Sequence, residues 1–337
     1  MSIVFRADGD ASTGLGHLYR IFALIEMLKV DFEYCLFVRD SSTISVIPEG
    51  YNLELISADV CINDEAKLIA NKYSAESTIL IVDGYQFNSA YQKRVKEEGF
   101  KLFYIDDLTT EYMYADVVIN HSPHVKESDY NSEPYTRFAL GTDYAILRPL
   151  FLEAAKRNRQ IDKIETAFVC FGGSDYNGLT FTAVKGLLHL ECISKIYVVL
   201  GAAFSDDRVL NLINKNKSKI DLKQNLSEKQ MVDVISKCQL AIVPTSSICY
   251  EVSSVKAFIF AGYYVDNQKE IYEALFYDEV IVGGGDLNLL TADDYKELIQ
   301  MNIINSLSIN QKYLRHQKNA FDGLSSNRIL SLINNLI

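Results

Sequence analysis

The chain has 337 residues, of which 48% are hydrophobic and 23% charged, an ordinary globular composition at a length that suggests two domains. Its net charge of −11 argues against a general nucleic-acid-binding surface, which needs a basic stripe. No apolar run approaches the ~20 residues of a membrane span, and residues 2–6 predict a strand rather than a signal peptide. We therefore expect a cytoplasmic protein with no nucleic-acid partner, no membrane insertion and reduced cysteines.

The first half of the chain alternates short apolar runs with helical patterns. Runs rich in Val, Ile and Phe that alternate with helices indicate a parallel sheet. The predicted strands are 2–6, 33–38, 53–56, 78–82, 101–105 and 116–119, and the clearest helices are 17–30 and 88–98.

The same pattern restarts after the polar stretch 153–163, which we interpret as a linker. The predicted strands here are 164–171, 195–200, 239–243, 257–261 and 279–282, and the predicted helices are 178–190, 228–237, 247–255 and 268–277. The expected fold class is α/β, with two doubly wound Rossmann-like domains facing across a cleft. Residues 1–152 form the first, and residues 153–337, including a C-terminal helix, form the nucleotide-binding second. Ligands of such sheets bind beyond the carboxyl ends of the strands.

A polar, glycine-containing loop follows the first strand and opens the first helix. It runs from Arg6 and Asp8 through Gly14 and Gly16 to His17. Glycine lets the backbone turn tightly and approach a ligand. In the first helical turn, the dipole disfavours an imidazolium, and a neutral imidazole can act as a general base. The alternative is a glycine turn with a histidine that caps the helix.

Two further loops in the second half are candidate anion sites. Gly172, Gly173, Ser174 and Asn177 stand at a strand-to-helix junction, where backbone N–H groups and a hydroxyl can cradle an anion. The alternative is a plain glycine turn in which Asp175 or Asn177 caps the helix.

The second candidate loop contains Ser246 and Ser247, which open a predicted helix and suit a diphosphate. Glu251, one helical turn later, suits ribose hydroxyls, and Asn267 and Gln268 offer amide donors. The alternative is a capping serine and a glutamate that faces solvent.

Carboxylates also follow two strands of the first half, namely Asp83, with Tyr85 after it, and the pair Asp106 and Asp107. The alternative is that these carboxylates cap backbone N–H groups of the loops or face solvent. No further acid or histidine stands at ligand spacing, so we expect no metal. His121 and His124 lie in a polar loop and are expected to be solvated.

These blocks, in this order, resemble the UDP-2,4-diacetamido-2,4,6-trideoxy-β-L-altropyranose hydrolases of pseudaminic acid biosynthesis, a pathway to cell-surface polysaccharide. The resemblance covers nearly the whole chain. The matching positions are Arg6, Asp8, Gly14, Gly16, His17, Arg20, Asp83, Tyr85, Ile105–Asp107, Gly141, Tyr144, Ala145, Leu147, Arg148, 171–177, Ser247, Glu251, Asn267, Gln268, Asp322, Gly323 and Arg328.

The resemblance implies a glycosyltransferase-B-like fold and a hydrolase that needs neither metal nor cofactor. In this mechanism His17 deprotonates a water, which attacks the anomeric carbon with inversion and releases UDP. The implied substrate and UDP contacts are Arg6, Asp8, Gly14, Gly16, Asp83, Tyr85, Tyr144, Gly172, Gly173, Ser174, Asn177, Ser246, Ser247, Glu251, Asn267 and Gln268.

Three alternatives stay open. The first is a glycosyltransferase of the same architecture that uses a UDP-sugar donor, related to the enzyme that adds N-acetylglucosamine to a lipid-linked peptidoglycan precursor. The others are a nucleotide-sugar-binding protein without catalysis and a hydrolysing 2-epimerase. The sequence leaves the oligomeric state open.

Overall fold

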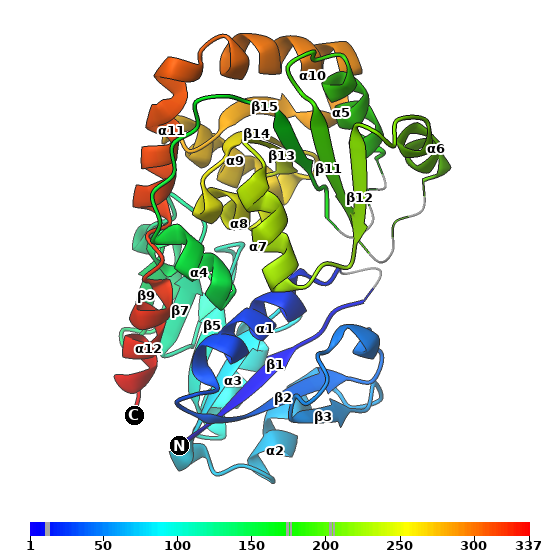
Figure 1. Cartoon of the computed structure of the whole chain (residues 1–337). Helices are drawn as coiled ribbons and strands as arrows, with labels where there is room; N and C mark the ends of the chain where they lie inside the picture. The colour runs from blue at the N-terminus through cyan, green and yellow to red at the C-terminus, as the bar shows by residue number, and fades with distance from the viewer. Residues whose placement is uncertain (11–13, 173–174, 176, 202–203, 205) are drawn as a thin grey trace. The chain divides into compact units, whose positions relative to one another are not determined.

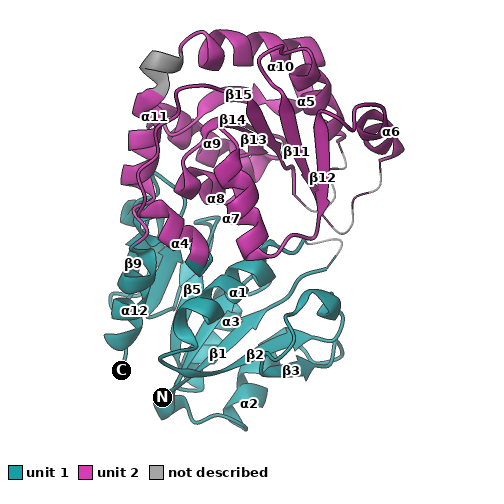
Figure 2. Ribbon diagram, viewed as in Figure 1, with its two compact units in different colours: residues 1–149, 324–337 teal, residues 150–323 magenta. Residues whose placement is uncertain are grey.

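The structure is a computed structural model that describes residues 1–10, 14–172, 175, 177–201, 204 and 206–337, with the backbone alone for 307–310 (Figure 1). The chain divides into two compact units. Unit 1 comprises Met1–Pro149 and Leu324–Ile337, and unit 2 comprises Leu150–Gly323 (Figure 2). The sequence placed the boundary after residue 152.

Unit 1 is built on a seven-stranded parallel sheet in the order β3-β2-β1-β4-β5-β7-β9. The order reverses between β1 and β4, so the loops that follow these strands diverge at the carboxyl edge of the sheet. The strands are β1 (Ser2–Ala7), β2 (Glu33–Arg39), β3 (Leu53–Ile56), β4 (Thr78–Asp83), β5 (Lys101–Ile105), β7 (Val117–Asn120) and β9 (Arg137–Leu140), and β6 (Tyr112–Met113) pairs with β8 (Asn131–Ser132).

Alternate residues of these strands enter two different cores, because successive side chains of a strand point to opposite faces. Ile3 and Phe5 pack with α1 (Gly16–Leu28) and α12 (Ser325–Asn334). Val4 packs on the other face with α2 (Glu65–Ala70) and α3 (Ser89–Glu97). Both faces of the sheet are therefore covered by helices.

Unit 2 repeats the design with a six-stranded parallel sheet, which reverses its order between β10 and β13. The strand order is β12 (Ile220–Gln224), β11 (Lys195–Leu200), β10 (Thr166–Val169), β13 (Leu240–Pro244), β14 (Phe258–Tyr263) and β15 (Val282–Asp286). Its helices are α4 (Pro149–Ala155), α5 (Leu179–Leu188), α6 (Asp207–Lys215), α7 (Glu228–Lys237), α8 (Ser247–Val255), α9 (Lys269–Tyr277), α10 (Ala292–Ile299) and α11 (Leu307–Ala320). Residues 300–304 add a π-helical turn.

Three expectations differ from the structure. Strand β15 begins only at Val282, where 279–282 were predicted, because the residues before it still form the turn that ends α9. Glu279 has φ of 53°, and the N–H of Val280 donates to the carbonyl oxygen of Leu275. The supposed linker 153–163 begins inside α4, and Arg159 donates to the carbonyl oxygens of Ser236, Cys238 and Lys256.

The third difference is the C-terminal helix, which was assigned to the second domain. The structure places α12 in unit 1, because Ile329 and Ile333 are fully buried in the core beside α1. None of the helices in the described part of the chain has both the length and the apolar character that crossing a membrane requires.

Candidate active site

His17 stands at the carboxyl edge of unit 1, where the strand order reverses. Helix α1 begins at Gly16, which confirms the prediction that His17 lies in its first turn. Gly14, in the loop before it, has φ of 80°, a conformation that glycine adopts without strain, and its N–H donates to the carbonyl oxygen of Asp10.

The imidazole of His17 is paired with a buried carboxylate. Its Nδ1 lies 2.7 Å from Oδ1 of Asp83, the last residue of β4, and the Asp83 side chain is fully buried. Because Asp83 also accepts hydrogen bonds from Arg20 at both oxygens, we assign the hydrogen of the His17 contact to Nδ1. That tautomer leaves Nε2 with the lone pair that a general base needs.

Arg20 joins this pair to a second carboxylate. One helical turn after His17, it donates to Asp83 at 2.7 and 2.8 Å and to Oδ1 of Asp107 at 2.6 Å. Burial opposes ionisation of Asp107, but Arg20 overrides it and lowers the pKa of that carboxyl to about 2. Tyr85, which is half exposed, sets its ring edge-on to His17 with centroids 4.6 Å apart.

The sequence predicted a solvated His121, but the structure buries this residue. It follows β7, the neighbour of β5, and only 8% of it is exposed. Its Nδ1 accepts the backbone N–H of Ile146, and burial, reinforced by the charge of Arg20, lowers its pKa to about 4. The ring is therefore neutral near pH 7. His124 is exposed, as predicted.

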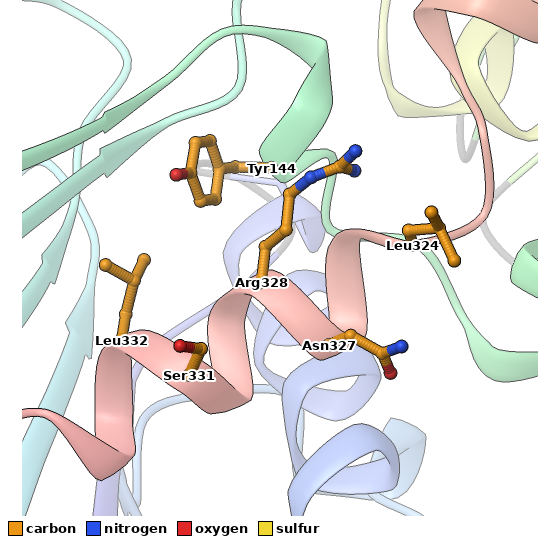
Figure 3. Close-up of a pocket in the computed structure, with 6 residues that line it drawn as sticks. All are labelled: Tyr144, Leu324, Asn327, Arg328, Ser331 and Leu332. Atoms are coloured by element: carbon orange, nitrogen blue, oxygen red, sulfur yellow. The ribbon is translucent and has the colours of Figure 1, made fainter.

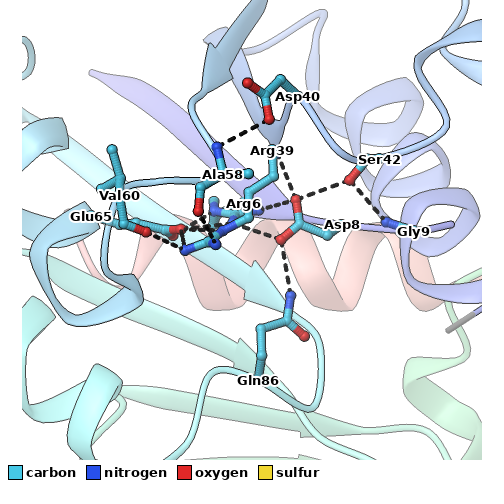
Figure 4. A network of polar contacts seen from close by, with 10 residues as sticks. All are labelled: Arg6, Asp8, Gly9, Arg39, Asp40, Ser42, Ala58, Val60, Glu65 and Gln86. Carbon is cyan, nitrogen blue, oxygen red and sulfur yellow. Dashed lines mark hydrogen bonds and ion pairs between the residues drawn. The ribbon is translucent and has the colours of Figure 1, made fainter. Parts of the chain in front are cut away.

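Arg6 and Asp8, which the sequence analysis predicted as substrate contacts, belong to a different network of polar contacts (Figure 4). Arg6 is fully buried and donates to both oxygens of Glu65 on α2, at 2.8 and 3.0 Å, and to Asp8 at 2.7 Å. Arg39 also donates to Glu65. Gln86 donates to Asp8, so the loop after Asp83 is tied to this network.

Tyr144 lies elsewhere in unit 1, at the end of the 3-10 turn Thr142–Tyr144. It lines an open groove of about 370 Å³ with residues that begin or belong to α12, namely Leu324, Asn327, Arg328, Ser331 and Leu332 (Figure 3). Arg328 donates to the carbonyl oxygen of Asp143 across this groove.

Unit 2 also carries predicted site residues at its strand reversal. After β10, Gly172 has φ of 85°, whereas Gly173 and Ser174 lie outside the described residues. Asp175 accepts the backbone N–H groups of Leu179 and Thr180 at 2.9 and 2.8 Å. It therefore caps α5, as the alternative interpretation of this loop allowed.

The loop after β13 is built from hydroxyl and amide groups. Thr245 is fully buried and donates to the carbonyl oxygens of Gly262 and Gln268. Ser246 and Ser247 follow at the start of α8, where Ser246 caps the helix without a side-chain hydrogen bond to it. The first N–H groups of a helix are donors without intrahelical partners and favour an anion.

The remaining predicted residues of unit 2 lie near these loops or on the adjoining helices. Asn177 donates to Asn288 at 2.6 Å, and Asn288 in turn donates to the carbonyl oxygen of Tyr264. Glu251 is partly buried on α8, Asn267 is exposed, and Gln268 is buried. In the described part of the chain, no three His, Cys, Asp or Glu side chains are grouped as metal ligands.

No protein-family model matches the chain. It is 26% identical over 287 residues, 81% of its length, to an uncharacterized protein of Methanocaldococcus jannaschii, and the match spans 58% of that relative. It is similar to MurG of Acinetobacter baumannii (TM-score 0.66, 12% identity, 99% of both chains) and to the calicheamicin glycosyltransferase CalG4 (0.65, 8%, 99% and 98%). It is also similar to HepE of Anabaena in complex with UDP (0.62, 12%, 100% of both chains).

The chain has the glycosyltransferase-B fold. On this fold the structure brings together His17, Asp83 and Tyr85 from the predicted site. Beside them stand Arg20 and Asp107, which the sequence analysis singled out without counting them among the substrate contacts. Arg20 also shares the helical face of His17, which lies three positions before it. Glu65, in the network around Arg6, and Asn288, in unit 2, carried no signal in the sequence.

Proposed function

We propose that this chain is an enzyme that transfers the sugar of a UDP-sugar to a hydroxyl acceptor, with His17 as general base. The observation that carries the proposal is the contact between Nδ1 of His17 and the buried carboxylate of Asp83. Asp83 fixes the tautomer and stabilises the imidazolium that forms when Nε2 takes the acceptor proton. The similarity to a glycosyltransferase and to a UDP complex of the same fold supports the choice of donor and reaction.

In the proposed reaction, the acceptor oxygen loses its proton to Nε2 of His17 and bonds to the anomeric carbon. The bond from that carbon to the diphosphate oxygen breaks, and UDP leaves with the electron pair. We assign the leaving charge to unit 2, where the backbone N–H groups at the start of α8, together with Gly172 and Asn177 among the described residues after β10, are the candidate donors. Glu251 and Gln268 are the candidate ribose and base contacts there.

Hydrolysis is the second candidate, with water as the acceptor. It is favoured by the ordered sequence blocks shared with the diacetamido-trideoxy-altropyranose hydrolases, from Arg6 to Arg328. The two reactions use the same base and leaving group and differ only in the group that His17 deprotonates. The acceptor requirement therefore separates them.

The test measures UDP release from a panel of UDP-hexoses and UDP-N-acetylhexosamines, including the diacetamido-trideoxy sugar, with and without sugar acceptors. Release that requires an acceptor supports transfer, and turnover in water alone supports hydrolysis. In both cases His17→Ala should lower turnover about 10²–10⁴-fold, the usual contribution of a general base. The matched control is His124→Asn, at an exposed histidine whose φ of 65° asparagine tolerates. Unchanged turnover in His17→Ala, or no binding of UDP by the wild type, would overturn the proposal.

A further inference from the structure

Arg20 lies between the two carboxylates that approach His17. Its guanidinium contacts Asp83 at the end of β4 and Asp107 after β5, and its Nη2 also comes within 2.8 Å of Nδ1 of His17. Only 11% of the Arg20 side chain is exposed. We propose that Arg20 is a positioning residue that offsets the negative charge of Asp83 and Asp107, so that His17 is an uncharged base when the acceptor arrives. The inference rests on the proposed function of His17.

Among the described residues of unit 1, four ionisable groups besides Tyr85 bear on the charge around His17. Asp83 and Asp107 are negative, Arg20 is positive, and the buried His121 is neutral. The neutrality of His121 follows from a pKa of about 4. Tyr85 contributes a ring contact to His17. His17 therefore stands beside a group with one excess negative charge.

Without Arg20, two uncompensated carboxylates would stand beside the imidazole. Nearby negative charge favours the imidazolium, and an imidazolium has no lone pair with which to accept a proton. The fork of Arg20 also fixes Asp83, because it donates to both oxygens of that carboxylate. A lysine would keep the charge but would lose this two-point contact.

The inference is tested on the full chain by NMR titration of the histidine ring protons, with the His17 signal assigned by its loss in His17→Ala. Arg20→Gln should raise the midpoint of the His17 titration by at least about one pH unit, a tenfold change in proton affinity. Asp107→Asn should lower it, and the double variant should return it close to the wild-type midpoint. The acidic limb of the pH–rate profile should move in the same directions, and Arg20→Lys should keep the limb in place with a lower kcat.

Single variants that shift the midpoint in the same direction, or that leave it in place, would overturn the inference. If Arg20→Gln does not fold, Asp107→Asn and Arg20→Lys still decide between a charge effect and a packing effect. The proposed function fails separately. If His17→Ala keeps full turnover while the midpoints move as expected, the charge balance is real and His17 is not the base.

Discussion

The carboxyl edges of the two sheets use different chemistry at the same topological position. In unit 1 the loops after β1, β4 and β5 carry charges that are paired in two networks, around Arg20 and around Arg6. In unit 2 the described residues that follow β13 and β15 offer hydroxyl and amide groups, as at Thr245 and Asn288. Fixed charges suit the control of a proton, and neutral donors suit an anion that must bind and leave. The contrast supports the proposal that unit 1 supplies the general base and unit 2 binds the nucleotide.

The largest expected effect tests whether unit 1 depends on buried charge. Glu65 is fully buried and accepts hydrogen bonds from Arg6 and Arg39. Glu65→Gln removes the buried negative charge that Arg6 and Arg39 share, leaves Arg6 with Asp8 alone, and should lower the free energy of unfolding by about 3–5 kcal/mol. Urea unfolding followed by tyrosine fluorescence measures this, since the chain contains no Trp.

The matched control for Glu65→Gln is Glu54→Gln in the same unit. Glu54 pairs with Lys72 in an ion pair in which a third or more of each side chain is exposed, so its loss should cost less than about 1 kcal/mol. If the two variants lose the same stability, the network around Arg6 is no more important than a surface ion pair, and the contrast between the two edges fails.

The next prediction concerns the pH dependence of unit 1. The pKa of His121 is about 4 in the folded protein against an ordinary value of 6.5. The unfolded chain therefore binds more protons between these values. The stability that His121 contributes is complete above pH 6.5 and is lost as the pH falls towards 4. Between pH 7 and 4.5 the loss from this group should be about 2–3 kcal/mol.

His121→Asn should remove most of that loss, because its side-chain oxygen can replace Nδ1 as acceptor of the Ile146 N–H. His124→Asn is the control at an exposed position with φ of 65°, which asparagine tolerates. Urea unfolding at pH 7 and 4.5 gives the difference for each variant. Equal acid sensitivity in all three proteins would show that His121 is not held neutral by the fold.

Much of this molecule follows from sequence patterns, and the exceptions have physical causes. His17 and Asp83 were predictable, because a strand followed by a polar glycine loop places side chains at the carboxyl edge. Glu65 was not, since it lies 59 positions from Arg6 and carries no motif of its own. His121 resembles a loop residue along the chain, and only the strand order β5-β7 buries it. The edge strand β12 was not predicted, because Asp221, Lys223 and Gln224 interrupt its apolar pattern.

The smallest expected effect tests unit 2. Asp175 caps α5 through the N–H groups of Leu179 and Thr180, so Asp175→Ala should lower the free energy of unfolding by about 1 kcal/mol. Ser227→Ala removes a comparable cap from α7, which follows β12, two strands away from β10 in the sheet. Both variants should lose stability, Asp175→Ala somewhat more, because alanine adopts the φ of 46° at this position less readily than aspartate.

Only Asp175→Ala should also weaken UDP binding, by about two- to tenfold in calorimetry, because its loop is the proposed diphosphate contact. The expected weakening of UDP binding is small because Asp175 caps α5 rather than donating hydrogen bonds to the ligand. Equal weakening by both variants would trace the effect to general destabilisation of unit 2. Unchanged binding in Asp175→Ala would remove the loop after β10 from the nucleotide site and would leave the start of α8 as the remaining candidate for the diphosphate.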